Sequence, residues 1–355
     1  MLLSELDQIG KREALADYIT NIMAADFPAM SMIPKGKRPN QGLVQFQVER
    51  YKDKGFRGVP EGKDADNFDS TPRTMLYGRR MRLWDNPGIS SESDENVIAG
   101  ESAGEMARQK RNSLVQVKMM GERAICSSLD SNAGTAQIGA QMRGLFAWQQ
   151  ASNWSDLPTD NTAALMPAAS RYDGTLDAAT ETLISDLFIS IYKARRTRSK
   201  LDALLGIQLK KAFSLFAGYT DTVSNKTATR HLNLDQSERE LITVVDRLVT
   251  DAADVDLHAS SYLLGDPDTG LATAGTHISG LILDMEMLEL AYTRLPRIRD
   301  LEDRGGGPRA ICEMMVTLVN KNPQGHGAIV CTGKTVANDT LPVFTAKAPT
   351  AKAAA

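Results

Sequence analysis

The feature that most constrains the fold of this chain is a long two-stranded hairpin near its N-terminus. This hairpin has little hydrophobic core of its own. In GLVQFQVERY, from Gly42 to Tyr51, polar and apolar side chains alternate with the period of a strand. The Gly-rich, charged stretch KGFRGVPEGKDAD follows, and TMLYGRRMRLW then predicts a return strand. A lone hairpin is only marginally stable in water. We therefore expect this one to rest on another surface, such as a neighbouring subunit.

The strongest helix pattern covers residues 91–129, after the hairpin. Serine and acidic residues at its start suit a helix N-terminus, and apolar residues from Ala103 to Ile125 recur at i, i+3 and i+4. A continuous helix of about 30 residues would be roughly 45 Å long, which suggests a structural spine. Residues 1–30 predict a helix followed by an extended arm, and the helical pattern ends at Asp26-Phe27-Pro28.

The rest of the chain mixes helices and strands, which indicates an α+β fold. Residues 130–175 predict irregular structure around the aromatic segment MRGLFAWQQ, and an amphipathic helix begins at Thr180. Further on, LITVVDRLVT predicts a strand, MEMLELAYTR a helix, AICEMMVTLVN a strand, NPQGHG a turn and GAIVC a last short strand. The tail from Thr335 is of low complexity.

Composition excludes several classes of protein. With 41 basic and 44 acidic residues among 355, the formal net charge is −3, which excludes a uniformly basic nucleic-acid coat but not a local basic face. No apolar run reaches the roughly 18 residues of a membrane span, and the charged N-terminus does not fit a signal peptide, so we expect folding in a cytosol. The cysteines, Cys126, Cys312 and Cys331, are far apart, which predicts reduced, buried thiols.

No motif for catalysis or cofactor binding meets its structural requirements. Gly100–Gly104 spells G-x-S-x-G, but a nucleophile elbow needs a buried strand before its serine, and the residues before Ser102 are polar and acidic. Gly333-Lys334-Thr335 lacks the upstream glycine of a phosphate-binding loop. None of the four histidines has metal-chelating spacing, and each is predicted to lie at the surface or in a turn. We expect no enzyme, no metal and no cofactor.

The order of these segments resembles that of the major capsid proteins, or major head proteins, of tailed bacteriophages, which have the Hong Kong ninety-seven-type (Johnson) fold. The resemblance is carried by LADYITNIMAADFPAMSMIPKGK, by the two strand segments of the hairpin, by the helical run with MRGLFAWQQ after it, and by ILDMEMLELAYTRLP with AICEMMVTLVNKNPQGHGAIV. It implies an N-terminal arm at residues 1–40, an E-loop at 41–86, a P-domain with the spine helix at 87–175, an A-domain at 176–295, return strands of the P-domain at 296–334 and a C-terminal tail at 335–355.

The same resemblance implies a function by association rather than by reaction. Copies of the chain would assemble as hexamers and pentamers into an icosahedral shell around packaged double-stranded DNA, contacted without sequence preference. Portal, scaffolding and decoration proteins are further candidate partners, and no membrane is involved. The protein would be found in the virion after assembly in the host cytoplasm.

Two groups of residues are singled out by this resemblance. Charged residues of the E-loop would lie between subunits and set their register; they are Arg50, Lys52, Lys54, Arg57, Glu61, Lys63 and Asp64. Cations of the spine helix would face DNA; they are Arg108, Lys110 and Arg111.

Two alternatives remain open from the sequence. An encapsulin-like nanocompartment shell has the same fold but encloses proteins instead of DNA. A serine hydrolase that uses Ser102 belongs to another class, and it predicts an active monomer or dimer that serine-directed phosphonates inhibit.

Overall fold

The structure is a computed structural model, and the chain within it divides into two compact units. The first unit comprises residues 1–26, 83–119 and 294–314, and the second comprises residues 27–82, 120–293 and 315–355. The residues that the structure describes are 26–49, 51, 55–56, 58–64, 68, 70–71, 73–90, 104–136, 138–150, 171–175, 181–216, 234–235, 238–239, 245–263 and 278–332.

The described chain contains both helices and strands, and the strands come largely in consecutive runs, which fits the predicted α+β class. In order they are α1 (Pro28–Met32), β1 (Leu43–Glu49), β2 (Arg73–Arg79), β3 (Met81–Asp85), α3 (Glu105–Ile125), α4 (Leu145–Trp148), β4 (Arg171–Thr175), α5 (Glu181–Arg195), β5 (Ser199–Leu205), α6 (Ile207–Phe216), β6 (Leu234–Asp235), β7 (Glu238–Arg239), β8 (Arg247–Val249), β9 (Ala253–Ala259), β10 (Gly280–Leu283), η6 (Met285–Met287), β11 (Leu288–Leu301), β12 (Arg309–Asn320), η7 (Pro323–Gly325) and β13 (Gly327–Thr332).

A six-stranded mixed sheet forms the core of the second unit. Its strand order is β4-β13-β10-β5-β9-β8, with parallel pairs β13–β4 and β5–β9 and antiparallel pairs elsewhere. Apolar residues alternate with charged ones along β5 and β9, so that Leu201 pairs with Val255 and both are fully buried. This alternation gives the sheet one apolar face, which must be covered.

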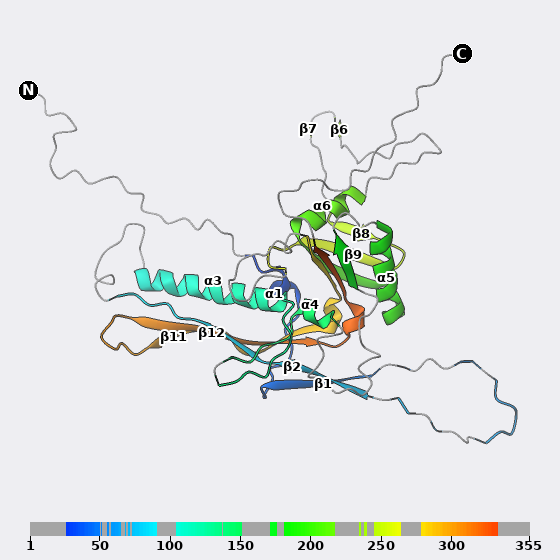
Figure 1. Cartoon of the computed structure of the whole chain (residues 1–355), viewed down its shortest axis with the longest axis horizontal. Helices are drawn as coiled ribbons and strands as arrows, with labels where there is room; N and C mark the ends of the chain where they lie inside the picture. The colour runs from blue at the N-terminus through cyan, green and yellow to red at the C-terminus, as the bar shows by residue number, and fades with distance from the viewer. Residues whose placement is uncertain are drawn as a thin grey trace, which may run out of the picture. The chain divides into compact units, whose positions relative to one another are not determined.

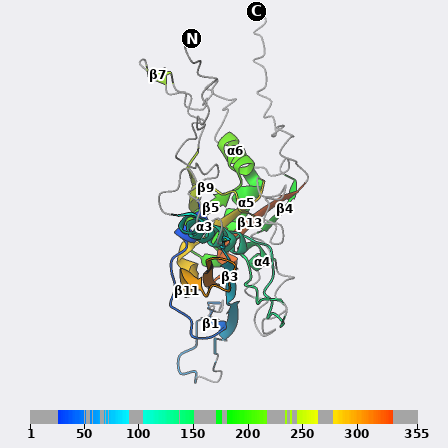
Figure 2. The ribbon, with the colours of Figure 1, turned by 90° about the vertical axis from the view of Figure 1, so that its left-hand side faces the viewer.

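Helices α5 and α6 supply that cover. Figures 1 and 2 show α5 beside the strands of the sheet, and buried side chains of both helices belong to one apolar cluster with β5 and β9. The helical contributions are Ile184, Leu187, Phe188 and Ile191 from α5 and Leu209, Ala212 and Phe213 from α6. Full burial of each large apolar side chain contributes about 1.5–3 kcal/mol, so this cluster is a main source of stability. The helix predicted from Thr180 is confirmed.

Strands β1 and β2 form the predicted antiparallel hairpin, with register from Leu43 opposite Arg79 to Glu49 opposite Arg73. Gly78 brings β2 close to β12, because a Cβ there would lie 2.8 Å from the carbonyl oxygen of Leu318. The prediction of a single return strand is wrong. The strand breaks at Arg80, whose N–H donates to the carbonyl of Gly42, and β3 then joins a different sheet of order β11-β12-β3.

The predicted 91–129 helix is longer than the helix that the structure describes. Helix α3 has 21 residues, which corresponds to about 32 Å, and Gly104 precedes it with φ 81°. The proposed caps at residues 91–94 lie outside the described residues. At the other end the helix stops at Ile125, because the Ser127 hydroxyl donates to the carbonyl of Ala124 and competes with further helical bonds.

The prediction of a helix over MEMLELAYTR is wrong. Residues Met285–Met287 form a single 3₁₀ turn, and Leu288 begins the 14-residue strand β11. Met, Glu, Leu and Ala are strong helix formers, but Leu288 and Leu290 are fully buried while Glu289 between them is not. Sheet packing of this two-residue alternation overrides the helix propensity.

A short helix also replaces the start of the predicted extended arm. Phe27 is outside the helical region at φ −132° and ψ 70°, as a residue before proline should be, but Pro28 then begins α1 instead of an extended segment. Proline suits the first helical position because its missing N–H would have no partner there. The helix predicted in residues 1–25 lies outside the described residues.

Several other predictions are confirmed. AICEMMVTLVN and GAIVC are strands, NPQGHG is a 3₁₀ turn, and all three cysteines are buried. Of LITVVDRLVT, only Arg247–Val249 is a described strand. The irregular region includes the unpredicted strand β4 and the wholly buried helix α4.

Candidate assembly surfaces

The segment that joins β1 to β2 exposes large apolar side chains to solvent. Phe56 and Phe68 are more than nine-tenths exposed, and Tyr51 and Val59 are nearly as open. One turn within the segment closes through a hydrogen bond from Lys63 N to Pro60 O of 3.3 Å, with Gly62 at φ 77°. Exposed aromatic side chains gathered on one segment are typical of a surface that another chain covers.

The charged residues predicted to lie between subunits belong to this same segment. Glu61, Lys63 and Asp64 are exposed, as that role requires. Arg50, Lys52, Lys54 and Arg57 lie outside the described residues. The described portion therefore offers both signs of charge beside the exposed aromatic side chains.

The cations predicted to face DNA differ in their surroundings along α3. Arg108 pairs with the buried carboxylate of Glu105, at 2.9 Å from its Nε to Oε2. Lys110 Nζ lies 2.6 Å from Asp300 Oδ1. Arg111 is exposed on the same helix. Carboxylates of the chain thus already neutralise two of the three cations.

A buried carboxylate likewise holds two cations of β11. Glu313 of β12 is 1% exposed and accepts from Arg294 Nη1 at 2.9 Å and from Arg297 Nη2 at 2.6 Å. Removing the two arginines would take these partners from a buried carboxylate, which is costly. This cluster joins neighbouring strands and is structural.

Charges also lie on part of the second face of the six-stranded sheet. Arg198 pairs with Asp254 at 2.7 Å and Lys200 with Asp256 at 3.0 Å, across β5 and β9. Arg247 of β8 adds a weaker contact to Asp254 at 3.4 Å. These exposed pairs contribute little stability each, but they make the part of this face over β5, β8 and β9 polar. Leu204 of β5 and Leu281 of β10 share the same face and are fully buried.

The sequence did not reveal a buried carboxylate that holds the first residues of α1. Glu122 of α3 is fully buried and accepts the backbone N–H groups of Ala29 at 2.7 Å and Met30 at 2.8 Å. These donors begin α1 and have no helical partner of their own. A glutamate in an apolar stretch of an amphipathic helix was the available signal, but its partner is 93 residues away in sequence.

The prediction that every histidine lies at the surface or in a turn is only half right for His326, which ends η7 but is fully buried. Its Nδ1 accepts the N–H of Asp284 at 3.0 Å, so Nε2 carries the proton and donates to Asn320 Oδ1 at 3.1 Å. Burial, and second the nearby Arg195 guanidinium, lower the pKa of His326 to about 3. Arg195 itself pairs with Asp284.

The described residues contain no group of three or more His, Cys, Asp or Glu side chains that could hold a metal ion. In the same part of the chain, every helix is too short or too polar to cross a bilayer. Burial raises the pKa of Cys331 to about 12, with Asp173 as the second cause, so this thiol stays protonated. Ser102, the nucleophile of the hydrolase alternative, lies outside the described residues.

Solved structures with the same fold include the capsid of one particle and chains from two phages. The capsid of a native GTA particle has a TM-score of 0.59 at 9% identity, covering 93% of this chain and 98% of that chain. A chain of Gordonia phage Cozz gives 0.54 at 10% identity, covering 92% of each. A chain of Mycobacterium phage Adephagia gives 0.53 at 8% identity, covering 94% of this chain and 99% of that chain. At such identities the likeness shows the fold alone.

The family comparison identifies the protein family as well as the fold. The family described as SU10 major capsid protein matches residues 3–335, which is nearly the whole chain. No curated protein sequence matches the chain. The resemblance to phage major capsid proteins found in the sequence is thereby confirmed, and neither the nanocompartment nor the hydrolase gains support. This chain belongs to the SU10 major capsid protein family, whose members are structural proteins of phage shells.

Proposed function

We propose that copies of this chain assemble, as hexamers and pentamers, into the icosahedral head shell of a tailed phage around packaged double-stranded DNA. Family membership and the capsid fold support this proposal. The mechanism is association, which needs no cofactor and no catalytic residue. Assembly would take place in the host cytoplasm and end in the virion, with portal, scaffolding and decoration proteins as additional partners.

The observation that carries the proposal is the exposed apolar side chains between β1 and β2. Phe56 and Phe68 would be unfavourable in water on an isolated protein, but they suit the apolar centre of a protein interface. The predicted E-loop, residues 41–86, would place them on an adjacent subunit. The predicted N-terminal arm (1–40) would reach a further neighbour, and the predicted A-domain (176–295) would meet its copies at the capsomer centre.

Charges in the same segment would then select the register of this contact. Glu61, Lys63 and Asp64 are exposed and carry both signs. Rim charges of this kind change association rate and specificity more than affinity. We assign the same role to Arg50, Lys52, Lys54 and Arg57.

The proposed DNA contact on α3 is weak and independent of sequence. Arg111 is the exposed cation, while Arg108 and Lys110 would have to share their charge between phosphate and their own carboxylates. Each phosphate neutralised adds about 0.9 to the salt slope of DNA binding. An Arg111→Ala substitution should therefore reduce that slope by at most about 1, with Arg299→Ala as the charge-matched control.

The test of the function is electron microscopy of the purified full-length protein, beside its mass by light scattering. Closed shells, or free hexamers and pentamers, are expected. A monodisperse monomer that stays so with its scaffolding partner would contradict the proposal and return attention to Ser102. DNA extracted from phage-derived particles supports the phage head, whereas enclosed protein cargo in its place would support the nanocompartment.

A further inference from the structure

Two arginines at the turn between β11 and β12 combine a missing ion pair with a place beside a surface hollow. Arg294, Arg297 and Lys110 each meet a carboxylate of the same chain. Arg304 and Arg309 have no ion-pair partner in the described part of the chain, which is also true of the exposed Arg111 and Arg299. Arg309 differs from those two because its Nε is buried without a hydrogen-bond acceptor there. An unmatched buried guanidinium nitrogen costs free energy unless a ligand satisfies it.

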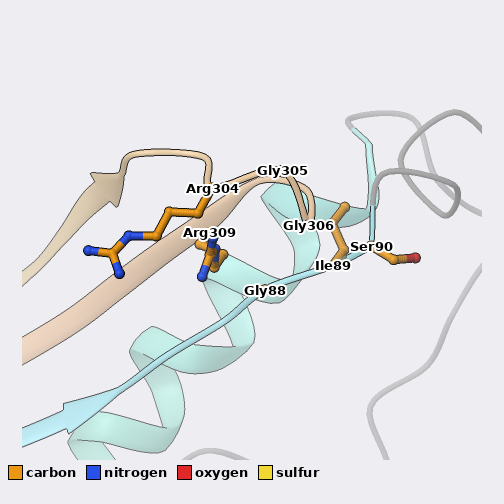
Figure 3. A pocket seen from close by; sticks show the side chains of 7 residues that line it. All are labelled: Gly88, Ile89, Ser90, Arg304, Gly305, Gly306 and Arg309. Carbon is orange, nitrogen blue, oxygen red and sulfur yellow. The ribbon is translucent and has the colours of Figure 1, made fainter.

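Both arginines line one open hollow of about 520 Å³. Figure 3 shows them at the hairpin turn, beside the segment that follows β3. The full lining is Gly88, Ile89, Ser90, Arg304, Gly305, Gly306 and Arg309. The hollow is large enough for the end of a side chain and open enough for one to enter from outside.

Backbone hydrogen bonds fix the walls of this hollow. Ala310 N donates to Pro87 O at 3.0 Å, and Ile89 N donates to Pro308 O at 3.3 Å. Asp303 is the acidic residue beside Arg304, but its Oδ1 accepts the N–H groups of Gly305 at 2.9 Å and Gly307 at 3.2 Å. Asp303 thus shapes the turn instead of neutralising the arginine.

The glycines of the turn keep the hollow open. Gly305 needs its glycine because φ is 85° there, whereas Gly306 has no such backbone requirement. A Cβ at Gly306 would meet nothing within 4 Å, so packing within the chain does not demand a glycine either. Its absent side chain leaves room for a group from outside the chain.

We propose that this hollow binds a carboxylate side chain from a second copy of the chain. Guanidinium groups bind carboxylates in a planar, bidentate geometry that is stronger than a neutral hydrogen bond. This inference rests on the proposed function, since assembly is what brings a second copy to the turn. It adds a specific electrostatic contact at Arg304 and Arg309 to the apolar contact of the β1–β2 segment.

Charge complementarity favours a carboxylate of another copy over a nucleic-acid phosphate. The chain has an excess of acidic residues, and exposed carboxylates without ion pairs in its described part include Glu61, Asp64, Asp186 and Asp251. Nucleic-acid backbones are held by rows of cations that follow successive phosphates. One hollow with two guanidinium groups and an apolar Ile89 wall instead suits a single anionic group.

The first test reverses the charge at the exposed arginine. R304E should raise the protein concentration needed for shell assembly at least about tenfold, because it would face a like charge. R299E makes the same charge change at an exposed position of β11 outside the hollow and should leave assembly close to wild type. Normal assembly of R304E beside an assembling wild type would overturn the site alone. Failure of the wild type to assemble would overturn the proposed function and the site with it.

The second test identifies the partner group. In R304K shells built from equal amounts of isotope-labelled and unlabelled chains, a zero-length carbodiimide joins the lysine amine to any carboxylate in contact with it. The proposal expects mixed-isotope peptides that join position 304 to one Asp or Glu of another copy. Crosslinks confined to one chain, or none, would overturn it. So would an R304E shell that forms normally but retains less DNA, since that result identifies phosphate as the ligand.

Discussion

The six-stranded sheet buries its apolar side chains, whereas the segment between β1 and β2 exposes them to solvent. In the sheet, residues such as Leu201 and Val255 are fully buried under α5 and α6, and the charges of the other face pair with one another. Between β1 and β2, Phe56 and Phe68 lie open to solvent, and no helix of the described chain covers them. The first region is complete within one chain, whereas we propose that another chain covers the second.

This difference separates two kinds of substitution. Changes in the first region should lower the free energy of unfolding of the subunit. Changes in the second should leave the subunit intact and impair only its association.

The largest expected effect is the loss of a core side chain. Phe188→Ala removes a ring of α5 that is 1% exposed within the apolar cluster. The free energy of unfolding should fall by about 3–5 kcal/mol, from lost burial and from the cavity left behind. Urea denaturation of the unassembled subunit measures this change. A loss below about 1 kcal/mol would mean that the sheet and α5 are not the stable region that we describe.

The next effect concerns the buried carboxylate that holds α1. Glu122→Ala leaves the N–H groups of buried Ala29 and partly buried Met30 without their acceptor, and should cost about 3 kcal/mol. Glu122→Gln keeps one acceptor oxygen and should cost about half as much. The same denaturation experiment compares the two variants. Equal losses for both would show that the hydrogen bonds are not the source of the effect.

Substitution of the two exposed aromatic side chains should impair assembly and leave the stability of the subunit nearly unchanged. The double variant Phe56→Ala, Phe68→Ala should change the unfolding free energy of the subunit by less than about 0.5 kcal/mol, because neither ring is buried. Its threshold concentration for assembly should rise about tenfold or more, since buried aromatic side chains dominate interfaces. Sedimentation of assembled particles at a series of concentrations gives the threshold. A subunit that is less stable but assembles normally would contradict both parts of this prediction.

The sequence predicted single helices and strands better than it predicted which strands pair. Local periodicity was enough for β1, α5, β12 and β13, because each has a clear two- or 3.6-residue pattern. It failed at Leu288–Leu301, where strong helix formers occupy a strand, and at Arg80, where one strand leaves its partner for another sheet. Both failures depend on which distant strand is adjacent, and no local pattern carries that information.

The candidate functional residues were harder to predict than the fold. The charged residues of the hairpin were predicted to lie between subunits, which stays a prediction, but the exposed side chains of Phe56 and Phe68 next to them were not predicted, because exposure is a property of the folded chain. The cations of α3 looked free in sequence, yet Arg108 and Lys110 pair with Glu105 and Asp300, the second from 190 positions further along the chain. Glu122 and His326 likewise have partners that only the fold brings close.

The last prediction tests the turn between β12 and β13 through pH. His326 has a folded pKa of about 3, below its ordinary value of 6.5, because it is buried and lies near Arg195. The unfolded chain therefore binds more protons between these two values, so the histidine lowers stability as pH falls from about 6.5 toward 3. One group can contribute at most about 1.4 kcal/mol per pH unit. Above pH 6.5 this contribution is constant.

Carboxylates also titrate in this range, so the comparison needs a variant that removes only the histidine. His326→Gln keeps a group that can accept from the N–H of Asp284 but cannot gain a charge. The difference in unfolding free energy between wild type and variant should shrink steadily from pH 6.5 downward, because only the wild type loses stability at this position. A difference that stays constant down to pH 4 would mean that protonated His326 is tolerated in the folded turn. In that case the hydrogen bond from Asp284 N to Nδ1 would not be the contact that holds it neutral, since a proton on Nδ1 must displace that donor.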